Sequence, residues 1–302
     1  MRLLIIGASG FLGAHVWRQA AAAGLKVITA GRTGPGPAGR CRHQRLDLSA
    51  ADPARIAAML TELAPDAVVN CAGATTGDPG ELAALNVTGV YALVHGMLLA
   101  GRPGRLIHLG SAAEYGRTEP GVPVHEQTMP RPSGMYGVTK LAGTRLVQVA
   151  VAGGLEGVVL RVFNPVGPGA PATSLAGRLA AELRRPAGPG AEIRVGALDA
   201  VRDLIDVRDV AAAVLAAARV PALRHPVVNI GSGRGVPVRA MVKELLAISG
   251  CASPVREDAP DLPRPADIPW QQADITRAAE DLGWAPHRDL ATSLADLWEA
   301  IH

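Results

Sequence analysis

The chain has 302 residues and a formal net charge of +3, an excess of basic residues too small to argue for a nucleic-acid partner. Its residues are 48% hydrophobic but only 3% aromatic, so a core would consist mainly of Ala, Val, Leu and Ile. The length suits one large domain or two smaller ones. Glycine and proline punctuate periodic segments without a low-complexity run, which indicates turns and not disorder.

Three cysteines, Cys41, Cys71 and Cys251, lie far apart, and no two have the spacing of a zinc or redox motif. We therefore expect reduced thiols and no metal site. We expect no apolar run that approaches the roughly 20 residues needed to span a bilayer. The first residues also lack a signal-peptide cleavage site. These features predict a cytoplasmic protein with no membrane partner.

In the first half of the chain, short apolar runs alternate with helical segments. Leu3–Ile6 is a continuous apolar run closed by Gly7, typical of a parallel strand buried on both faces. A Gly/Pro/Arg-rich loop is expected over 31–45. Further strands are expected at 26–30, just before Asp47, and at 66–70, 106–109 and 157–163, and helices at about 11–23, 52–63, 80–100 and 133–152. The alternation predicts an α/β fold, a Rossmann-type doubly wound parallel sheet.

After Asn164 the pattern changes to turns and shorter elements. Helices are expected at 175–185, 206–219 and 291–301, strands at 192–195 and 227–230, and an irregular Pro-rich segment at 254–269. We infer a Rossmann domain over 1–165, to which 201–230 returns. A smaller C-terminal substrate-binding region, 166–200 with 231–302, would pack over the carboxyl edge of the sheet, where ligands bind in open α/β folds.

A glycine motif, Gly-x-x-Gly-x-x-Gly, lies between the first strand and the first helix. Glycines allow a tight turn and a close approach to a pyrophosphate, and the helix N-terminus offers free N–H groups. An ordinary βα turn is the alternative, but the strand before the motif and the amphipathic helix after it favour dinucleotide binding. The residues expected to bind the cofactor here are Gly7, Ser9, Gly10, Phe11, Leu12 and Gly13.

The end of the second strand, 27–33, lacks the carboxylate that usually binds the ribose of NAD. Arg32 stands where a cation could pair with the 2′-phosphate of NADP. Three more arginines follow: Arg40, Arg42 and Arg45. A solvated basic loop is the alternative interpretation. We favour NADP(H) over NAD(H), and we expect Asp47 and Leu48 at the adenine edge of the cofactor.

Tyr136 and Lys140 are four residues apart and therefore share one face of a helix. A phenol with a pKa near ~10 is poorly suited to acid–base chemistry at neutral pH, and a neighbouring ammonium lowers that pKa. Alone, this pair would be a helix-surface contact. Ser111, however, follows the apolar strand 106–109 and so lies at the carboxyl edge of the sheet. Its hydroxyl could hydrogen-bond a substrate oxygen while Tyr136 exchanges a proton.

These motifs resemble the extended short-chain dehydrogenase/reductases of the NAD-dependent epimerase/dehydratase family over nearly the whole chain. Besides the opening glycines, the resemblance rests on 70–73, Asn86, 110–116, Tyr136-x-x-x-Lys140 and 161–165. It implies an NAD(P)-dependent enzyme with Ser111, Tyr136 and Lys140 as its catalytic residues. The cofactor-lining residues that it implies are Cys71, Ala72, Gly73, Tyr136, Lys140 and Val166.

The C-terminal half resembles members of this family that act on nucleotide sugars. Arg202 and Arg264 match two arginines that grip the substrate diphosphate, and Asn164 matches an asparagine that also contacts phosphate. Two converging guanidiniums suit a diphosphate, although each alone could be a surface ion pair. The expected partner is therefore a nucleotide-diphosphate sugar. The motifs look most like GDP-4-keto-6-deoxy-D-mannose reductases, except that Ala113 replaces their Glu and Glu114 follows it.

The resulting hypothesis is an NAD(P)H-dependent reductase of a nucleotide-linked 4-keto-(6-deoxy) sugar, with Tyr136 as general acid. The alternatives are a nucleotide-sugar 4-epimerase with tightly bound NAD, and a non-catalytic NADPH-binding protein, which the intact Tyr and Lys disfavour. We do not expect a 4,6-dehydratase, because Ala112 and Ala113 stand where dehydratases of the family carry carboxylates. Glu114, one residue further on, should face away from the sugar.

Relatives in the family pair through two long helices, which correspond here to about 80–100 and 133–152. The first of these segments carries the apolar residues Leu82, Leu85, Val90, Leu93, Val94 and Met97. That is more apolar surface than one helix needs to cover its own sheet. We therefore predict a homodimer.

Overall fold

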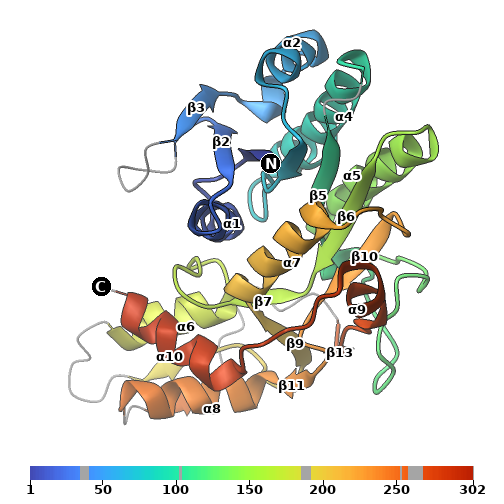
Figure 1. Cartoon of the computed structure of the whole chain (residues 1–302). Helices are drawn as coiled ribbons and strands as arrows, with labels where there is room; N and C mark the ends of the chain where they lie inside the picture. Colours follow the sequence, from blue (N-terminus) through green and yellow to red (C-terminus); the bar gives the residue numbers. More distant parts are fainter. Residues whose placement is uncertain (35–40, 102–103, 185–191, 252–253, 258–267, 302) are drawn as a thin grey trace.

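The computed structural model describes residues 1–34, 41–101, 104–184, 192–251, 254–257 and 268–301 (Figure 1). Its centre is a seven-stranded parallel sheet with the order β10-β6-β5-β4-β1-β2-β3. The strands are β1 (Arg2–Ile6), β2 (Lys26–Gly31), β3 (Arg42–Arg45), β4 (Ala67–Asn70), β5 (Arg105–Ser111), β6 (Gly157–Val162) and β10 (Val227–Ile230). The predicted Rossmann-like sheet is thus confirmed.

Helices cover both faces of this sheet. The side chains of β1 point alternately to the two faces, and those after Arg2 are all buried, so both faces must be covered. Leu3 and Ile5 pack toward α1 (Phe11–Ala22), α7 (Val207–Arg219) and α9 (Thr276–Leu282). Leu4 and Ile6 pack toward the opposite helices, α2 (Pro53–Leu63), α4 (Gly89–Leu99) and α5 (Met135–Ala152). A strand buried on both faces reads as a continuous apolar run, which is why β1 could be recognised from sequence.

The segment Pro79–Leu99 corrects one expectation. It consists of α3 (Pro79–Ala83), a π-helical segment (Ala84–Thr88) and α4, and by length and composition it is apolar enough to span a membrane. We had expected no such run. Half of its most apolar window is buried in this fold, as for a helix packed into a core.

The apolar residues on which the dimer prediction relied are also mostly internal. Val90, Leu93, Val94 and Met97 belong to the core beside β1 and β4. The large apolar side chains exposed on α4 and α5 are different ones: Tyr91, Leu98, Leu99, Met135, Val138 and Val149. The homodimer therefore remains a prediction, with another face as its candidate interface.

Strand β3 is the short strand expected just before Asp47, and it occupies the end of the segment 31–45 that we expected to be a loop. Its four residues are polar, and their side chains are at most partly buried. They nevertheless pair in parallel with β2, with His43 beside Thr29. An edge strand has one open side and can carry charged side chains, so the apolar pattern that marks the central strands is absent.

A smaller C-terminal lobe lies at the bottom of Figure 1. Its four-stranded sheet comprises β7 (Asn164–Val166), β9 (Val201–Asp206), β11 (Gly235–Pro237) and β13 (Trp270–Gln271). A second pair of strands is β8 (Ile193–Arg194) with β12 (Val255–Arg256), and the helices are α6 (Leu175–Arg184), α8 (Val238–Ser249) and α10 (Leu290–Ala300). Strand β9 pairs within this lobe, and the chain returns to the large sheet only with α7 and β10. We had expected this return to the Rossmann domain to begin at residue 201, which is somewhat earlier.

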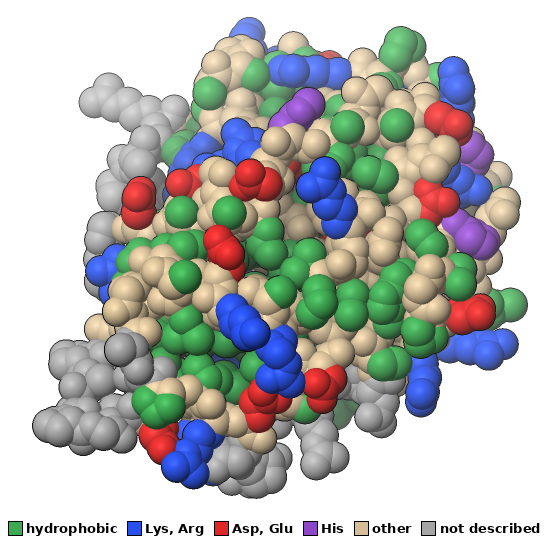
Figure 2. Space-filling model, turned by 90° about the horizontal axis from the view of Figure 1, so that it is seen from below, with side chains coloured by type: hydrophobic (Ala, Val, Ile, Leu, Met, Phe, Trp, Pro, Cys, Tyr) green, Lys and Arg blue, Asp and Glu red, His purple; other side chains and the backbone are tan. Residues whose placement is uncertain are grey.

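Seen from below, the lobe carries acidic and basic side chains with hydrophobic ones between them (Figure 2). The described residues of this face therefore do not form a field of one sign, the feature that would attract nucleic acid. Helices α8 and α9 were not among the predicted elements.

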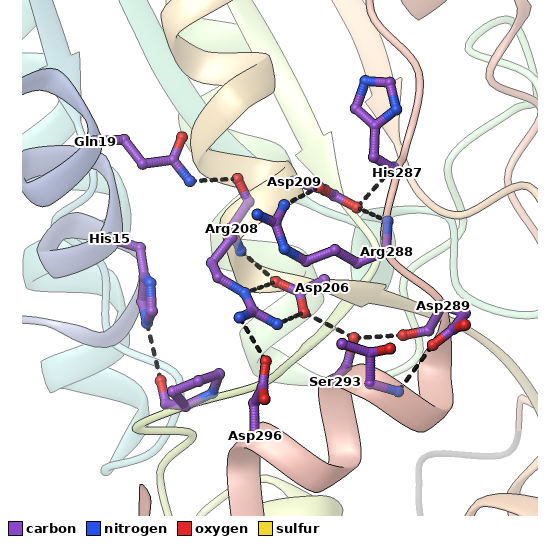
Figure 3. Close-up of polar contacts among 12 residues, drawn as sticks. His15, Gln19, Asp206, Arg208, Asp209, His287, Arg288, Asp289, Ser293 and Asp296 are labelled. Carbon is purple, nitrogen blue, oxygen red and sulfur yellow. Dashed lines mark hydrogen bonds and ion pairs between the residues drawn. The ribbon is translucent and has the colours of Figure 1, made fainter. Parts of the chain in front are cut away.

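A polar network joins this lobe to the helices of the large sheet (Figure 3). Asp206 caps α7 and accepts hydrogen bonds from Arg208, whose Nη2 lies 2.6 Å from Asp206 Oδ2. Arg208 also pairs with Asp296 of α10 at 2.5 Å. On α1, His15 Nε2 donates to the carbonyl of Pro168 at 2.9 Å, and burial lowers the pKa of His15. These contacts fix the lobe over the carboxyl edge of the large sheet.

Candidate active site

The candidate site lies where β1, β4 and β5, neighbours in the large sheet, reach their carboxyl ends. Gly7 follows β1 and has φ +81°, a conformation that favours glycine. A Cβ at Gly7 would lie 2.8 Å from the backbone nitrogen of Ala72, which follows β4. The fold therefore brings the glycine loop directly against the predicted cofactor-lining segment 71–73.

The glycine loop fits a dinucleotide pyrophosphate. A Cβ at Gly13 would lie 2.1 Å from the carbonyl oxygen of Gly7, so only glycine allows this tight turn. Helix α1 starts after Gly10 with no side-chain cap and no acidic residue in its first turn. Its first N–H groups and the positive end of its dipole are therefore available to an anion.

The side chains of Ser9, Phe11 and Leu12 make different contacts. Ser9 is exposed and accepts a hydrogen bond from the hydroxyl of Thr33 at 3.3 Å. The ring of Phe11 meets His15 edge-on, with centroids 5.9 Å apart. Leu12 packs against the core. Phe11 and Leu12 would thus serve a cofactor mainly through their backbone N–H groups.

At the end of β2, Arg32 is exposed and close to Asp47. The pKa of Asp47 is lowered chiefly by the hydrogen bond from the Ser49 hydroxyl, at 2.6 Å, and in part by the charge of Arg32. Leu48 is buried, and its backbone lies against Gly89. Arg32 and Asp47 therefore lie close together beyond the carboxyl ends of β2 and β3. The Leu48 side chain belongs to the core.

The other two described arginines of this region, Arg42 and Arg45, have different surroundings. Arg42 forms an ion pair with Glu62 of α2, so its charge is already matched. Arg45 is exposed and lies beside Gly31 at the carboxyl end of the β2–β3 pair, next to Arg32. Arg40 lies outside the described residues. Among the described arginines of this region, Arg32 and Arg45 are thus the candidates to meet a 2′-phosphate.

Ser111 is the last residue of β5 and is 9% exposed. Its hydroxyl accepts a hydrogen bond from the backbone of Ala113 at 3.2 Å, and it interacts with the phenol of Tyr136 on α5. The pKa of Tyr136 is raised by burial, which outweighs the opposing hydrogen bond with Ser111. The expected lowering of this pKa by Lys140 is therefore not what the structure shows.

Lys140 is buried, and its Nζ donates to the carbonyl of Leu109 at 2.5 Å. Burial lowers its pKa, while the negative charge of Glu114 acts in the opposite direction. A Cβ on Gly73 would lie 3.7 Å from the Lys140 Nζ. The ammonium therefore faces the segment 71–73, as a residue that binds a cofactor there would.

Cys71 in that segment is unsuited to nucleophilic chemistry. Burial raises the pKa of its thiol to about 12, against the opposing charge of Lys140. Within the described ranges no three His, Cys, Asp or Glu residues are placed to hold a metal ion. The predicted catalytic residues Ser111, Tyr136 and Lys140 therefore lie beside a segment whose thiol is unreactive.

Asn86 is a site residue whose role we did not predict. It is 2% exposed, in the π-helical segment before α4. Its Oδ1 accepts from the Ala74 N–H at 2.9 Å, and its Nδ2 donates to the Ala74 carbonyl at 2.8 Å and to Thr139 Oγ1 at 3.1 Å. It thereby ties the cofactor-lining segment to α5, one residue before Lys140. An asparagine inside an apolar helix was the available signal.

Glu114 is the second residue whose contacts at the candidate site we did not predict. It is fully buried, and its carboxylate accepts the Ser111 N–H at 2.8 Å and pairs with Arg161 at 2.8 Å. A carboxylate engaged in this way is not free to protonate a sugar hydroxyl. The contacts support the prediction that this chain is not a 4,6-dehydratase.

On the lobe, Arg202 of β9 is partly buried, and burial lowers its pKa. Its Nη1 donates to the carbonyl of Val201 at 2.9 Å, and no carboxylate of the described residues pairs with it. Asn164 of β7 donates to the carbonyl of Asp203 at 2.9 Å, which keeps it beside β9. A partly desolvated guanidinium without an acidic partner is suited to a phosphate.

Two further predicted residues are less informative. Val166 is 1% exposed and packs in the core of the lobe. It lies at the end of β7, beside Asp206 of β9. Arg264 lies outside the described residues, so its meeting with Arg202 stays a prediction.

The model of the NAD dependent epimerase/dehydratase family matches residues 3–231. Over 304 residues the chain is 38% identical to dTDP-6-deoxy-L-talose 4-dehydrogenase (NAD(P)(+)) of Kitasatospora kifunensis, covering 99% of this chain and 95% of that protein. It is 30% identical to GDP-6-deoxy-D-mannose reductase of Pseudomonas aeruginosa, covering 99% and 97%.

Solved structures show the same likeness. The UDP-glucose 4-epimerase of Thermotoga maritima with UDP-glucose superposes with a TM-score of 0.86 at 25% identity, covering 99% of this chain and 98% of that chain. RMD of Pseudomonas aeruginosa complexed with NADPH superposes with a TM-score of 0.79 at 25% identity and the same coverage.

Proposed function

Because the chain belongs to the NAD dependent epimerase/dehydratase family, we propose that this NAD(P)-dependent enzyme reduces the 4-keto group of a nucleotide-linked 6-deoxy sugar. The observation that carries the proposal is the meeting of Ser111, Tyr136 and Lys140 beside the glycine loop. Two relatives support it: a 4-dehydrogenase of a dTDP-6-deoxy sugar and a reductase of a GDP-6-deoxy sugar. Dehydrogenation and ketone reduction are one reaction in opposite directions.

The residues of the site divide this reaction between them. A reduced nicotinamide, when bound, supplies the hydride that reaches the keto carbon. The Ser111 hydroxyl orients the ketone oxygen, and Tyr136 gives that oxygen its phenolic proton, so the ketone becomes a secondary alcohol. The raised pKa of Tyr136 keeps the phenol protonated at neutral pH, the state that a proton donor requires. Lys140 stays within reach of the cofactor-lining segment through its contact with Leu109.

For the cofactor we propose NADP(H) in preference to NAD(H). Arg32 and Arg45 stand at the end of β2 and β3, and no acidic residue ends β2. Guanidinium groups suit the doubly charged 2′-phosphate, whereas a ribose hydroxyl is usually bound by a carboxylate.

For the substrate we propose a nucleotide-diphosphate sugar whose diphosphate is held by Arg202, with Asn164 and Arg264 beside it. The partial burial of Arg202 and its lack of an acidic partner within the described residues support this role. UDP-glucose in the similar Thermotoga maritima structure is a ligand of the same class.

A nucleotide-sugar 4-epimerase is the second candidate. It is favoured by the TM-score of 0.86 to a UDP-glucose 4-epimerase and by 31% identity to that of Azospirillum brasilense. Such an enzyme would keep NAD bound through purification and would consume no cofactor. Arg32 at the end of β2 speaks against tightly held NAD.

One experiment separates the two candidates. The purified protein is denatured and any released nucleotide is identified, and the native protein is then mixed with NADPH and a dTDP- or GDP-linked 4-keto-6-deoxy sugar. Loss of NADPH absorbance in proportion to sugar supports the reductase. Stoichiometric NAD in the purified protein, with no NADPH consumed, would establish the epimerase instead.

A further inference from the structure

A buried ion pair adjoins Ser111. The side chains of Glu114 and Arg161 are 0% and 2% exposed, and Arg161 Nε lies 2.8 Å from Glu114 Oε2. The other carboxylate oxygen, Oε1, accepts the backbone N–H of Ser111 at 2.8 Å. One carboxylate therefore joins the last residue of β5 to a guanidinium on β6.

The backbone makes room for this pair at Gly110. Gly110 and Arg161 are register partners on the adjacent strands β5 and β6. A Cβ at Gly110 would lie 2.7 Å from Glu114 Oε1 and 3.3 Å from Cγ of Arg161. A side chain at this position would collide with the Glu114 carboxylate and with Val159, and would crowd Arg161, so glycine leaves the room that the ion pair needs.

The guanidinium also lies over the ring of Tyr115. Its Cζ lies 4.5 Å from the centroid of the Tyr115 ring, and the Tyr115 hydroxyl donates to Asn229 Oδ1 at 2.7 Å. Stacking over an aromatic face favours a desolvated cation. The Arg161 side chain thus has one fixed position in which it can meet Glu114.

The charge of Glu114 reaches the reacting groups. It raises the pKa of Tyr136, as does burial, the larger cause, and it raises the pKa of Lys140 against burial. The other titratable groups around Lys140 are His108 on β5 and Cys71 after β4. Burial keeps the pKa of His108 well below its usual value and raises that of Cys71 to about 12, so both are neutral at pH 7.

A buried ion pair adds little stability compared with well-packed apolar side chains, so its place beside Ser111 needs another reason. We propose that Glu114, paired with Arg161, is a positioning residue that fixes Ser111 through its backbone N–H and sets a negative charge beside the Tyr136 phenol. The proposal rests on the proposed function only in treating Tyr136 as the proton donor. Its electrostatic part can be measured without any substrate.

The chain offers a direct measurement, because it contains only three tyrosines. Protein labelled with ¹³C at the tyrosine Cζ gives three NMR signals, and Tyr136→Phe assigns one of them. Removing a nearby negative charge favours the phenolate, so Glu114→Gln should make Tyr136 ionise about one pH unit lower than in the unaltered protein. An unchanged titration of Tyr136 in Glu114→Gln would overturn the proposal.

Asp209→Asn is the matched control. The Asp209 carboxylate is also buried, accepts the backbone N–H groups of His287 and Arg288 and pairs with Arg288 at 2.7 Å (Figure 3). It lies on α7 and is not among the groups that shift the pKa of Tyr136 or of Lys140. Both variants lose a buried charge, and only Glu114→Gln should move the Tyr136 titration. Equal movement in both would show a general effect of destabilisation and would contradict the proposal.

Arg161→Lys covers the case in which Glu114→Gln does not fold. It keeps the positive charge beside Glu114, so Tyr136 should ionise at nearly the same pH as in the unaltered protein. A shift of about one pH unit in Arg161→Lys would contradict the proposal.

Kinetics test the positioning of Ser111. We expect Glu114→Gln to lower kcat roughly tenfold while NADPH binding, measured by fluorescence, stays within about twofold. The alkaline fall of kcat/KM should also move to lower pH. An unaltered protein that reduces no nucleotide 4-keto sugar, but whose Tyr136 titration moves in Glu114→Gln, would reject the proposed function and leave this inference standing.

Discussion

The carboxyl edge of the large sheet and the small sheet of the lobe carry their functional side chains in different ways. Ser111 ends a strand whose seven residues are all buried, and Tyr136 and Lys140 share a helix of 18 residues. Arg202 and Asn164 lie on strands of six and three residues that are only partly buried. Long, packed elements hold a reaction geometry more rigidly than short ones. Changes at the first region should therefore alter kcat, and changes at the second should alter KM.

Tyr136→Phe tests the rigid region and should have the largest effect. Without the phenolic proton, kcat for ketone reduction should fall about 100- to 10,000-fold, with little change in NADPH affinity. Tyr91→Phe is the control, because Tyr91 is exposed on α4 and contacts only His95 among the described polar groups. A Tyr136→Phe enzyme with full activity would show that the proton comes from elsewhere.

Asp206→Asn tests the junction between the two regions. The Asp206 side chain is fully buried and pairs with Arg208. Loss of its charge should lower the free energy of unfolding by about 3 kcal/mol, measured by urea denaturation. Asp296→Asn should cost less than about 1 kcal/mol, because this partner is partly exposed. Similar costs for both would mean that the buried charge is not the main contact at the junction.

The same residue predicts a pH dependence. Hydrogen bonds from Arg208 and Ser293 hold the pKa of Asp206 below its usual value, against the opposing effect of burial. Its contribution to stability is therefore fully present above about pH 4, the pKa of an unfolded Asp, and is lost as the pH falls through the lowered pKa. Asp206→Asn should flatten the stability curve in this acidic range. An unchanged acid limb would contradict the assignment.

Arg202→Ala tests the lobe. Loss of a charge-assisted contact of about 2 kcal/mol should raise KM for the nucleotide sugar roughly 30-fold, with kcat nearly unchanged. Arg239→Ala is the control, because Arg239 is more exposed and pairs with Asp199 and Glu257. A fall in kcat with unchanged KM would place Arg202 in the chemistry instead.

Arg32→Ala should have a smaller effect and test the cofactor preference. We expect the Kd for NADPH to rise roughly tenfold, because one charged contact to the 2′-phosphate is lost. The Kd for NADH should change little. Arg42→Ala, which breaks an ion pair with Glu62, should leave both values unchanged. An equal loss for NADPH and NADH would mean that Arg32 does not contact the 2′-phosphate.

The smallest effect on chemistry is expected at the proposed dimer face. Leu98 and Val149 are 49% and 73% exposed, on adjacent helices α4 and α5. Leu98→Glu with Val149→Glu should convert a homodimer to a monomer in light scattering, without loss of fold. A monomer mass for the unaltered protein at micromolar concentration would reject the dimer.

Much of the rigid region was predictable, because its elements repeat simple patterns. The apolar run of β1, the glycines after it and the spacing of Tyr136 and Lys140 are local features of sequence. Strand β3 was predicted only as a short strand before Asp47, without its bounds or its pairing, because an edge strand is held by backbone pairing and not by apolar side chains. Its pairing decides which arginines stand beside Arg32.

The supporting contacts of the site were harder to predict, because they join residues that are distant in sequence. Glu114 meets Arg161 and Asn86 meets Ala74 only after the sheet and helices are packed. The pKa of Tyr136 is likewise raised by burial, which depends on tertiary packing and cannot be predicted from a local motif. In the lobe, short strands and irregular segments gave few periodic signals, so α8 and the pairing of β9 were missed.

The most direct test of the central claim follows the hydride itself. The enzyme is mixed with NADPH deuterated at the transferred position of nicotinamide C4 and with a nucleotide-linked 4-keto-6-deoxy sugar, and the product is analysed by NMR. We predict one deuterium at C4 of the sugar for each NADP formed, and with Tyr136→Phe the same ratio at a rate about 100- to 10,000-fold lower. An enzyme that incorporates no deuterium and consumes no NADPH here, but interconverts nucleotide-linked 4-hydroxy sugars supplied in a parallel reaction, would contradict the reductase and identify an epimerase.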